Sequence, residues 1–152
     1  MRYHYGVVVT IDTSVLFQAF HSRGGASFQI LQMVRFGEIT MAVSLPVFQE
    51  YRDLLSRHEV QRQLDLHPDD IQVILQFIAT VARPTSIRYA WRPNLRDEND
   101  NMVMELALAS GSEYLITRNT RDFVLDSDLS NDEVAVVTPG EFMRMWRNRY
   151  GT

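Results

Sequence analysis

The strongest constraint on the fold of this chain is a run of β-branched residues followed directly by a helical pattern. Val7-Val8-Val9-Thr10-Ile11 has no polar face, which is typical of a parallel strand covered on both sides. Asp12 or Thr13 is placed to cap a helix that reaches about His21. Parallel neighbours need a crossover connection, usually a helix, so this strand and helix predict the start of a parallel α/β sheet.

The same alternation continues along the chain. Further strands are predicted at residues 39–43, 86–89, 114–117 and 134–138, and further helices at 27–36, 45–57, 68–82, 99–110 and from 139 onward. Thr138-Pro139-Gly140-Glu141 opens the last helix, and its inward side is predicted to hold Phe142, Met145 and Trp146. Without a repeat or a linker, residues 1–152 are expected to form one domain. The predicted fold is a three-layer α/β/α sandwich with a central parallel sheet of four to five strands.

Composition excludes several kinds of chemistry. The chain has no cysteine, which excludes disulfides, thiolate metal sites and cysteine nucleophiles, and permits a reducing compartment. It has no apolar run of about 18 residues and no signal-peptide pattern, so we expect a cytoplasmic protein. All 15 basic residues are arginine, which excludes lysine Schiff-base and P-loop chemistry. The net charge of −4 does not exclude nucleic acid, because a local group of arginines can bind phosphate.

Acidic and amide side chains follow two of the predicted strands. Asp12 comes directly after the first strand, and Asn119 and Asp122 come just after the strand at 114–117. In open parallel sheets, ligands bind outside the carboxyl ends of the strands. These side chains are therefore predicted to meet at one edge of the sheet.

Two helices bring further carboxylates toward the same edge. Glu50 lies at the border of the apolar stripe of its helix, and Asp100 shares an inward face with Val103 and Ala107. Asp97 precedes this second helix. Each acid alone also fits an ordinary structural role, as a helix cap, a turn former or a solvated helix residue.

A divalent cation would relieve the repulsion among converging carboxylates. Zinc fits poorly, because there is no thiolate and the four histidines lack HxxH or HExxH spacing. Mg²⁺ or Mn²⁺ fits an oxygen-only set, and could activate water and stabilise a leaving oxygen in phosphodiester hydrolysis.

Three stretches resemble one known family: Val8 to Leu16, Pro46 to Tyr51, and Leu95 to Phe123. They look like that family's first strand and acid, its helix with the second acid, and its third and fourth acids around a short strand. Val137 to Phe142 matches the last strand and helix. Over nearly its whole length the chain resembles the PIN-domain ribonucleases, most closely the bacterial VapC-like toxins of toxin–antitoxin pairs.

The resemblance implies a PIN-like fold and a Mg²⁺- or Mn²⁺-dependent endoribonuclease that hydrolyses RNA phosphodiester bonds. The implied catalytic residues are Asp12, Glu50, Asp100 and Asp122; the implied metal ligands are Asp12, Asp100, Asp122 and Asp97; the implied supporting residues are Ser14, Thr117 and Asn119. Asp97 competes with Asp100 for the role of third acid. The resemblance also implies a small antitoxin partner and a homodimer. Arginines near the acidic segments in sequence are candidates for RNA contacts, namely Arg52, Arg92, Arg96, Arg118 and Arg121.

Two other functions stay open at this stage. One is an RNA-processing PIN nuclease without an antitoxin, and the other is a binding module that docks RNA or protein without hydrolysis. A metal-dependent phosphatase is disfavoured, because its nucleophilic aspartate is normally followed two residues later by another aspartate. Here Ser14 stands at that position.

Overall fold

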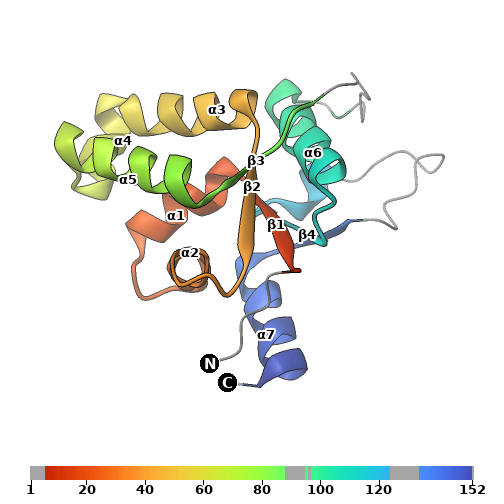
Figure 1. Ribbon diagram of the computed structural model, residues 1–152. Helices are drawn as coiled ribbons and strands as arrows, with labels where there is room; N and C mark the ends of the chain where they lie inside the picture. Colours follow the sequence, from red (N-terminus) through yellow and green to blue (C-terminus); the bar gives the residue numbers. More distant parts are fainter. Residues whose placement is uncertain (1–5, 88–94, 96, 124–133, 152) are drawn as a thin grey trace.

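The computed structural model describes residues 6–87, 95, 97–123 and 134–151. In these ranges five parallel strands form one sheet in the order β3-β2-β1-β4-β5 (Figure 1). The elements are β1 (Val8–Ile11), α1 (Thr13–His21), α2 (Ala26–Arg35), β2 (Thr40–Val43), α3 (Leu45–Ser56), α4 (His58–Leu64), α5 (Pro68–Val81), β3 (Arg83–Pro84), α6 (Glu98–Ser110), β4 (Tyr114–Ile116), the 3₁₀ turn η1 (Thr120–Phe123), β5 (Ala135–Val137) and α7 (Pro139–Tyr150). The predicted PIN-like α/β fold is confirmed.

The central strand β1 sets the position of the site. Ile11 pairs with Ile116 of β4, and Ile116 pairs with Val137 of β5. The ladder continues one residue further, because the Asp12 N–H donates to the Ile116 carbonyl at 3.0 Å and the Thr117 N–H donates to the Val137 carbonyl at 2.9 Å. Asp12 and Thr117 therefore lie next to each other at the carboxyl edge of the sheet.

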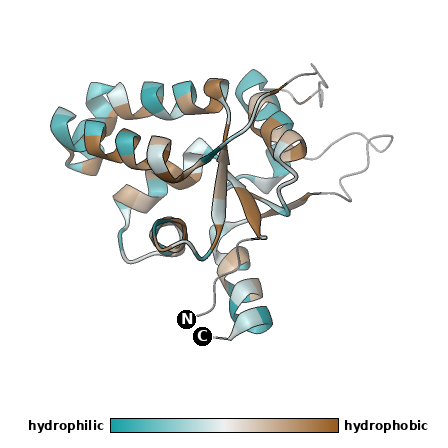
Figure 2. Cartoon of the chain, in the orientation of Figure 1, coloured by the Kyte–Doolittle hydropathy of each residue, from teal (hydrophilic) through white to brown (hydrophobic). Residues whose placement is uncertain are grey.

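Helices cover both faces of the sheet. Figure 1 shows α1 and α2 on one side of the strands and α6 on the other, where α6 packs against β1 and β2. The helix α3 follows β2 and packs against α1, α4, α5 and α6, so it covers the end of β2 at the top of Figure 1. Figure 2 shows a hydrophobic β1 at the centre, between helices that mix hydrophobic and hydrophilic residues. None of the helices in the described ranges is long and apolar enough to cross a bilayer.

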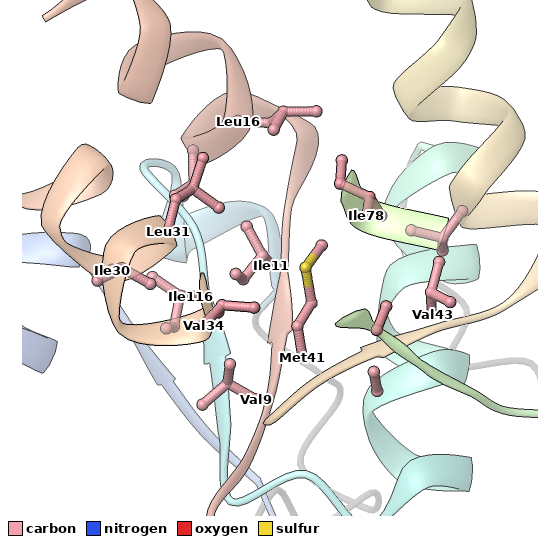
Figure 3. Packing of buried hydrophobic residues seen from close by; sticks show 14 of the residues in the cluster. Val9, Ile11, Leu16, Ile30, Leu31, Val34, Met41, Val43, Ile78 and Ile116 are labelled. Atoms are coloured by element: carbon pink, nitrogen blue, oxygen red, sulfur yellow. The ribbon is translucent and has the colours of Figure 1, made fainter. Parts of the chain in front are cut away.

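The core forms around β1 because both of its faces are covered. In Figure 3, Val9 and Ile11 of β1 lie among Leu31 and Val34 of α2 and Met41 of β2, and all five are buried. Removing these side chains from water is the main favourable term in forming such a fold. A rigid β1 therefore holds the residue that follows it, Asp12, in a fixed place.

The strand predicted at residues 86–89 is not found in the part that the structure describes, because residues 86 and 87 belong to no strand. The edge strand is instead β3, with Arg83 beside Ala42 and Pro84 beside Val43. It begins just one residue after α5, without an intervening turn, and residues 88 and 89 lie outside the described ranges. Proline is rare within sheets but is tolerated at an edge, where no neighbour needs its N–H.

One residue of the last helix was also assigned wrongly. Phe142 and Trp146 are buried, with 1% and 9% of their surface exposed, but Met145 is 39% exposed. The rings of Phe142, Trp146 and Tyr150 contact one another in sequence, with centroids 5.8 Å and 4.4 Å apart. The inward stripe of α7 therefore follows a strict four-residue spacing, and Met145 falls outside it.

Candidate active site

Asp12 occupies the junction between β1 and α1. One carboxylate oxygen, Oδ1, accepts the N–H of Thr13 at 2.9 Å and so caps α1. The other, Oδ2, accepts the hydroxyls of Ser14 and Thr117, each at 2.8 Å. Only 8% of Asp12 is exposed. Hydrogen bonds to both oxygens hold the carboxylate in one orientation and stabilise its charge.

The turn after β4 holds both hydroxyls in place. The Arg118 N–H donates to Ser14 Oγ at 3.2 Å, and the Asn119 N–H donates to Thr117 Oγ1 at 3.1 Å. Each hydroxyl thus accepts from the turn and donates to Asp12. Of the three predicted supporting residues, Ser14 and Thr117 contact Asp12 directly, and Asn119 acts through its backbone.

Asp100 lies in the first turn of α6 and carries the clearest electrostatic signal of the site. The pKa of Asp100 is raised from 3.8 to about 6, first by burial and then by the charges of Asp12, Asp97 and Asp122. Asp97 caps the same helix, where its carboxylate accepts the Asn99 N–H at 2.9 Å. Acids from three separate parts of the chain are therefore close enough to repel one another.

The start of α6 is held by a residue that the sequence analysis missed. The buried side chain of Asn101 accepts the Leu95 N–H at 2.7 Å and donates to the Leu95 carbonyl at 3.3 Å. These two bonds link α6 to the segment before it. An amide one position after Asp100, on the inward side of the helix, was the available signal, because a buried amide needs such partners.

Asp122 is carried by η1, just after β4. Its N–H donates to the Asn119 carbonyl at 3.0 Å, which closes the turn. The next residue, Phe123, is buried in the core. The turn therefore has a fixed position on the protein, and Asp122 itself is exposed beside the other acids.

Glu50 is carried by a different helix from the other predicted acids. It is half-buried on α3, which packs against both α1 and α6, and the carboxylates that raise the pKa of Asp100 are Asp12, Asp97 and Asp122. Asp12, Asp97 and Asp122 thus each raise the pKa of Asp100, and Glu50 lies on a helix that packs against α1 and α6.

Tyr51, next to Glu50, is a second residue that the sequence analysis missed as part of the site. It is fully buried, and its hydroxyl donates to the carbonyl of Ile11, the residue before Asp12. Burial raises the pKa of Tyr51, and the negative charge of Asp12 raises it further. No local pattern in the sequence marks Tyr51 as part of the site, and only its hydrogen bond to the end of β1 shows what its hydroxyl contacts.

The acidic set fits a hard divalent cation. In the described ranges no group of three or more His, Asp or Glu side chains is arranged to hold one metal ion. Mg²⁺ does not require such a cage, because it keeps several waters and usually binds one or two protein carboxylates. The donors are all oxygens, and the pKa of Asp100 is raised first by burial and then by neighbouring negative charges that a cation would offset.

The predicted RNA-binding arginines lie in different surroundings. Arg118 is exposed at the edge of the site, where its Nη1 donates to Gln18 Oε1 of α1 at 2.9 Å. Arg52 is exposed on α3 and lies over the Phe48 ring, 5.8 Å from its centroid. Arg121 is exposed on η1. Arg92 and Arg96 lie outside the described residues.

A five-stranded parallel sheet with acids gathered at its carboxyl edge defines the class as PIN-like α/β proteins. The family model described as the PIN domain matches residues 8–121, and the chain therefore belongs to the PIN domain family. Members of this family are typically nucleases and are generally metal-dependent.

Solved structures agree with this fold. The chain is similar to one in the crystal structure of VapBC2 from Rickettsia felis bound to a DNA fragment from their promoter. The TM-score is 0.57 at 14% sequence identity, and the match covers 87% of this chain and 98% of that chain. No curated protein matches the sequence.

Proposed function

We propose that this protein is a metal-dependent endoribonuclease that hydrolyses RNA phosphodiester bonds. The proposal rests on the Asp12 carboxylate, which is buried at the carboxyl edge of the sheet and held by Ser14 and Thr117, and on the pKa of Asp100, which burial raises first and repulsion from Asp12, Asp97 and Asp122 raises further. Proteins rarely keep such repulsion unless a bound cation or a proton compensates it. Membership of the PIN domain family supports a nuclease as the reason.

We assign different roles to the acidic residues of the site. Asp12 and Asp100 are the ligands that we assign to the cation, and Asp97 and Asp122 add negative charge around it. A bound Mg²⁺ or Mn²⁺ supplies a more acidic water as nucleophile and positive charge for the leaving oxygen. Glu50 keeps its predicted catalytic role from the border of the site.

Two neutral residues and one arginine support these acids. Ser14 and Thr117 keep the Oδ2 atom of Asp12 in position through their 2.8 Å hydrogen bonds. Arg118, next to Ser14, is placed to hold a phosphate of the RNA backbone.

The biological role that we propose is the toxin of a toxin–antitoxin pair. The similarity to a chain of VapBC2 supports an antitoxin as partner. The homodimer is proposed only because the sequence resembles the VapC-like toxins. Expression of the protein alone should inhibit growth, and where a short neighbouring gene encodes an antitoxin, its co-expression should relieve that inhibition; the absence of such a gene would favour an RNA-processing nuclease.

The test of the activity is cleavage of a mixed RNA panel that contains tRNA, rRNA fragments and single strands. We expect the wild type to cut RNA with Mg²⁺ or Mn²⁺ and not with EDTA. Asp100→Asn should lower the rate by about 100-fold or more. The matched control is Asp53→Asn, an exposed acid on α3, which should leave the rate unchanged.

A folded wild type that neither cuts RNA nor binds a divalent cation would overturn the proposal. Binding of RNA without turnover, equal in the wild type and Asp100→Asn, would identify a binding module instead.

A further inference from the structure

The charges are divided unevenly between two neighbouring groups of helices, α1–α2 and α3–α5. Residues 13–37, which include α1 and α2, contain two arginines and no carboxylate. Residues 45–81, which include α3, α4 and α5, contain six carboxylates and three arginines. In a chain with a net charge of −4, α3 to α5 are therefore acidic overall, whereas α1 and α2 carry no acid between Asp12, which caps α1, and Glu38, which follows α2.

The last helix extends the side that is poor in acids. α7 carries three arginines and a single carboxylate, Glu141, and it packs against α2, which packs against α1. Arg147 of α7 contacts α2 directly, because its Nη2 donates to Gln29 Oε1 at 3.5 Å. We call the surface of these three helices and of the turn after β4 the α1–α2–α7 face. The exposed arginines of these helices and their adjoining loops are Arg23, Arg35, Arg118, Arg144, Arg147 and Arg149.

Two of these arginines are oriented by neutral amides. Arg118 donates to Gln18 and Arg147 donates to Gln29. By contrast, Arg149 at the end of α7 forms an ion pair with Glu113 at 3.5 Å. An amide oxygen positions a guanidinium without neutralising it, and leaves its other N–H groups free for the oxygens of a phosphate.

The α1–α2–α7 face begins at the acidic edge. Asp12 caps α1, and the N–H of Arg118 contacts Ser14 in the first turn of that helix. α7 begins at Pro139, two residues after β5 ends, at the same edge of the sheet. At 1.5 Å per residue, Arg144 and Arg147 lie about 8 and 12 Å further along α7.

We propose that single-stranded RNA leaves the acidic site across the α1–α2–α7 face, with its phosphates bound by these arginines. This inference rests on the proposed function for the location of the scissile phosphate. The acidic side, α3 to α5, repels the same strand. The face thus sets the direction in which RNA runs and favours substrates that are longer than the few nucleotides at the acids.

The test compares two double variants of equal charge change. Arg35→Gln/Arg147→Gln removes two charges from the face, and Arg57→Gln/Arg62→Gln removes two exposed charges near α4 on the acidic side. The probe is a fluorescent 20-nucleotide single-stranded RNA without base pairing, titrated in EDTA to prevent cleavage. Each phosphate contact on a single strand contributes about 0.7 to the slope of log affinity against log salt concentration. The face variant loses two such contacts, so its slope should be about 1.4 smaller than that of the wild type.

That loss of slope means that the advantage of the wild type over the face variant shrinks about sevenfold between 50 and 200 mM salt. The control variant should keep the slope of the wild type. With metal present, cleavage of the 20-nucleotide RNA should show a raised KM in the face variant, and cleavage of a trinucleotide should not change.

The outcomes separate the two proposals. Equal salt slopes for the face and control variants would overturn the proposal that RNA binds the α1–α2–α7 face, even if RNA is cut normally. A loss of antitoxin binding in the face variant, without a change in RNA binding, would also overturn it and assign the surface to a protein partner. A smaller salt slope for the face variant in EDTA would support RNA binding by the face even if no RNA is cut. The absence of cleavage would then count only against the proposed nuclease activity.

Discussion

The substitution Asp100→Asn should stabilise the protein when no metal is bound, although it removes a residue of the proposed site. The pKa of Asp100 is about 6 in the folded protein against 3.8 for an unperturbed aspartate. The folded protein therefore binds this proton more tightly than the unfolded chain does. Stability is lost as the pH rises from about 4 to 6, and at neutral pH the ionised side chain carries the full penalty.

The size of this penalty follows from the difference between the two pKa values. At 1.36 kcal/mol per pKa unit, the difference corresponds to about 3 kcal/mol. Asp100 is only half-buried, and solvent screening reduces the penalty, so we expect a gain of about 1 to 1.5 kcal/mol from asparagine. For a chain of this length the gain corresponds to a Tm increase of about 2 to 6 °C.

The assay is thermal unfolding in EDTA at pH 7.5 and at pH 4, with Asp53→Asn as the control. At pH 7.5 the Tm of Asp100→Asn should be higher than that of the wild type. At pH 4, where the wild-type carboxyl is protonated, the two proteins should have the same Tm. Adding Mg²⁺ should raise the Tm of the wild type and of Asp53→Asn but not that of Asp100→Asn. If Asp100→Asn is no more stable than the wild type at pH 7.5, the acids do not repel one another as described, and the reasoning is refuted.

Three further predictions follow from the same site. Asp12→Asn should have the opposite effect and destabilise the protein by about 1 kcal/mol in urea unfolding, because an amide nitrogen in place of Oδ2 cannot accept the hydroxyls of Ser14 and Thr117; stabilisation would contradict it. Tyr51→Phe should cost about 1 to 3 kcal/mol, since the buried Ile11 carbonyl loses its donor, and it should weaken Mn²⁺ binding more than Ile78→Val, a core variant that leaves the site intact. The affinity for Mg²⁺ should fall as the pH drops below about 6, where Asp100 takes up its proton; calorimetry at pH 7.5 and 5.5 should show this, and equal affinities would contradict it.

Most of the fold could be predicted, because its signals are local. The β-branched run before Asp12 and the capping residues Ser44 and Thr138 specify where strands end and helices begin. The edge strand β3 was misplaced because Pro84 is an unfavourable residue for a strand, and only its pairing with β2 makes it one. That pairing joins residues about 40 positions apart, and no local pattern records it.

The site could be predicted only as a set of residues. The sequence places Asp12 and Asp122 after strands, but the repulsion that raises the pKa of Asp100 depends on how α6 packs beside β1. The contact of Tyr51 with Ile11 and that of Asn101 with Leu95 have the same origin. Both side chains lie on the inward sides of their helices, and the role of a buried polar atom can be assigned only when its hydrogen-bond partner is known.

The most direct test of the metal site is a calorimetric titration of Mn²⁺ into the wild type, Asp100→Asn and Asp53→Asn at pH 7.5. The acidic edge predicts binding to the wild type and to Asp53→Asn with the same affinity, and binding to Asp100→Asn that is weaker by at least about tenfold. No binding to the wild type, or equal binding to all three proteins, would contradict the assignment of a divalent cation to these carboxylates.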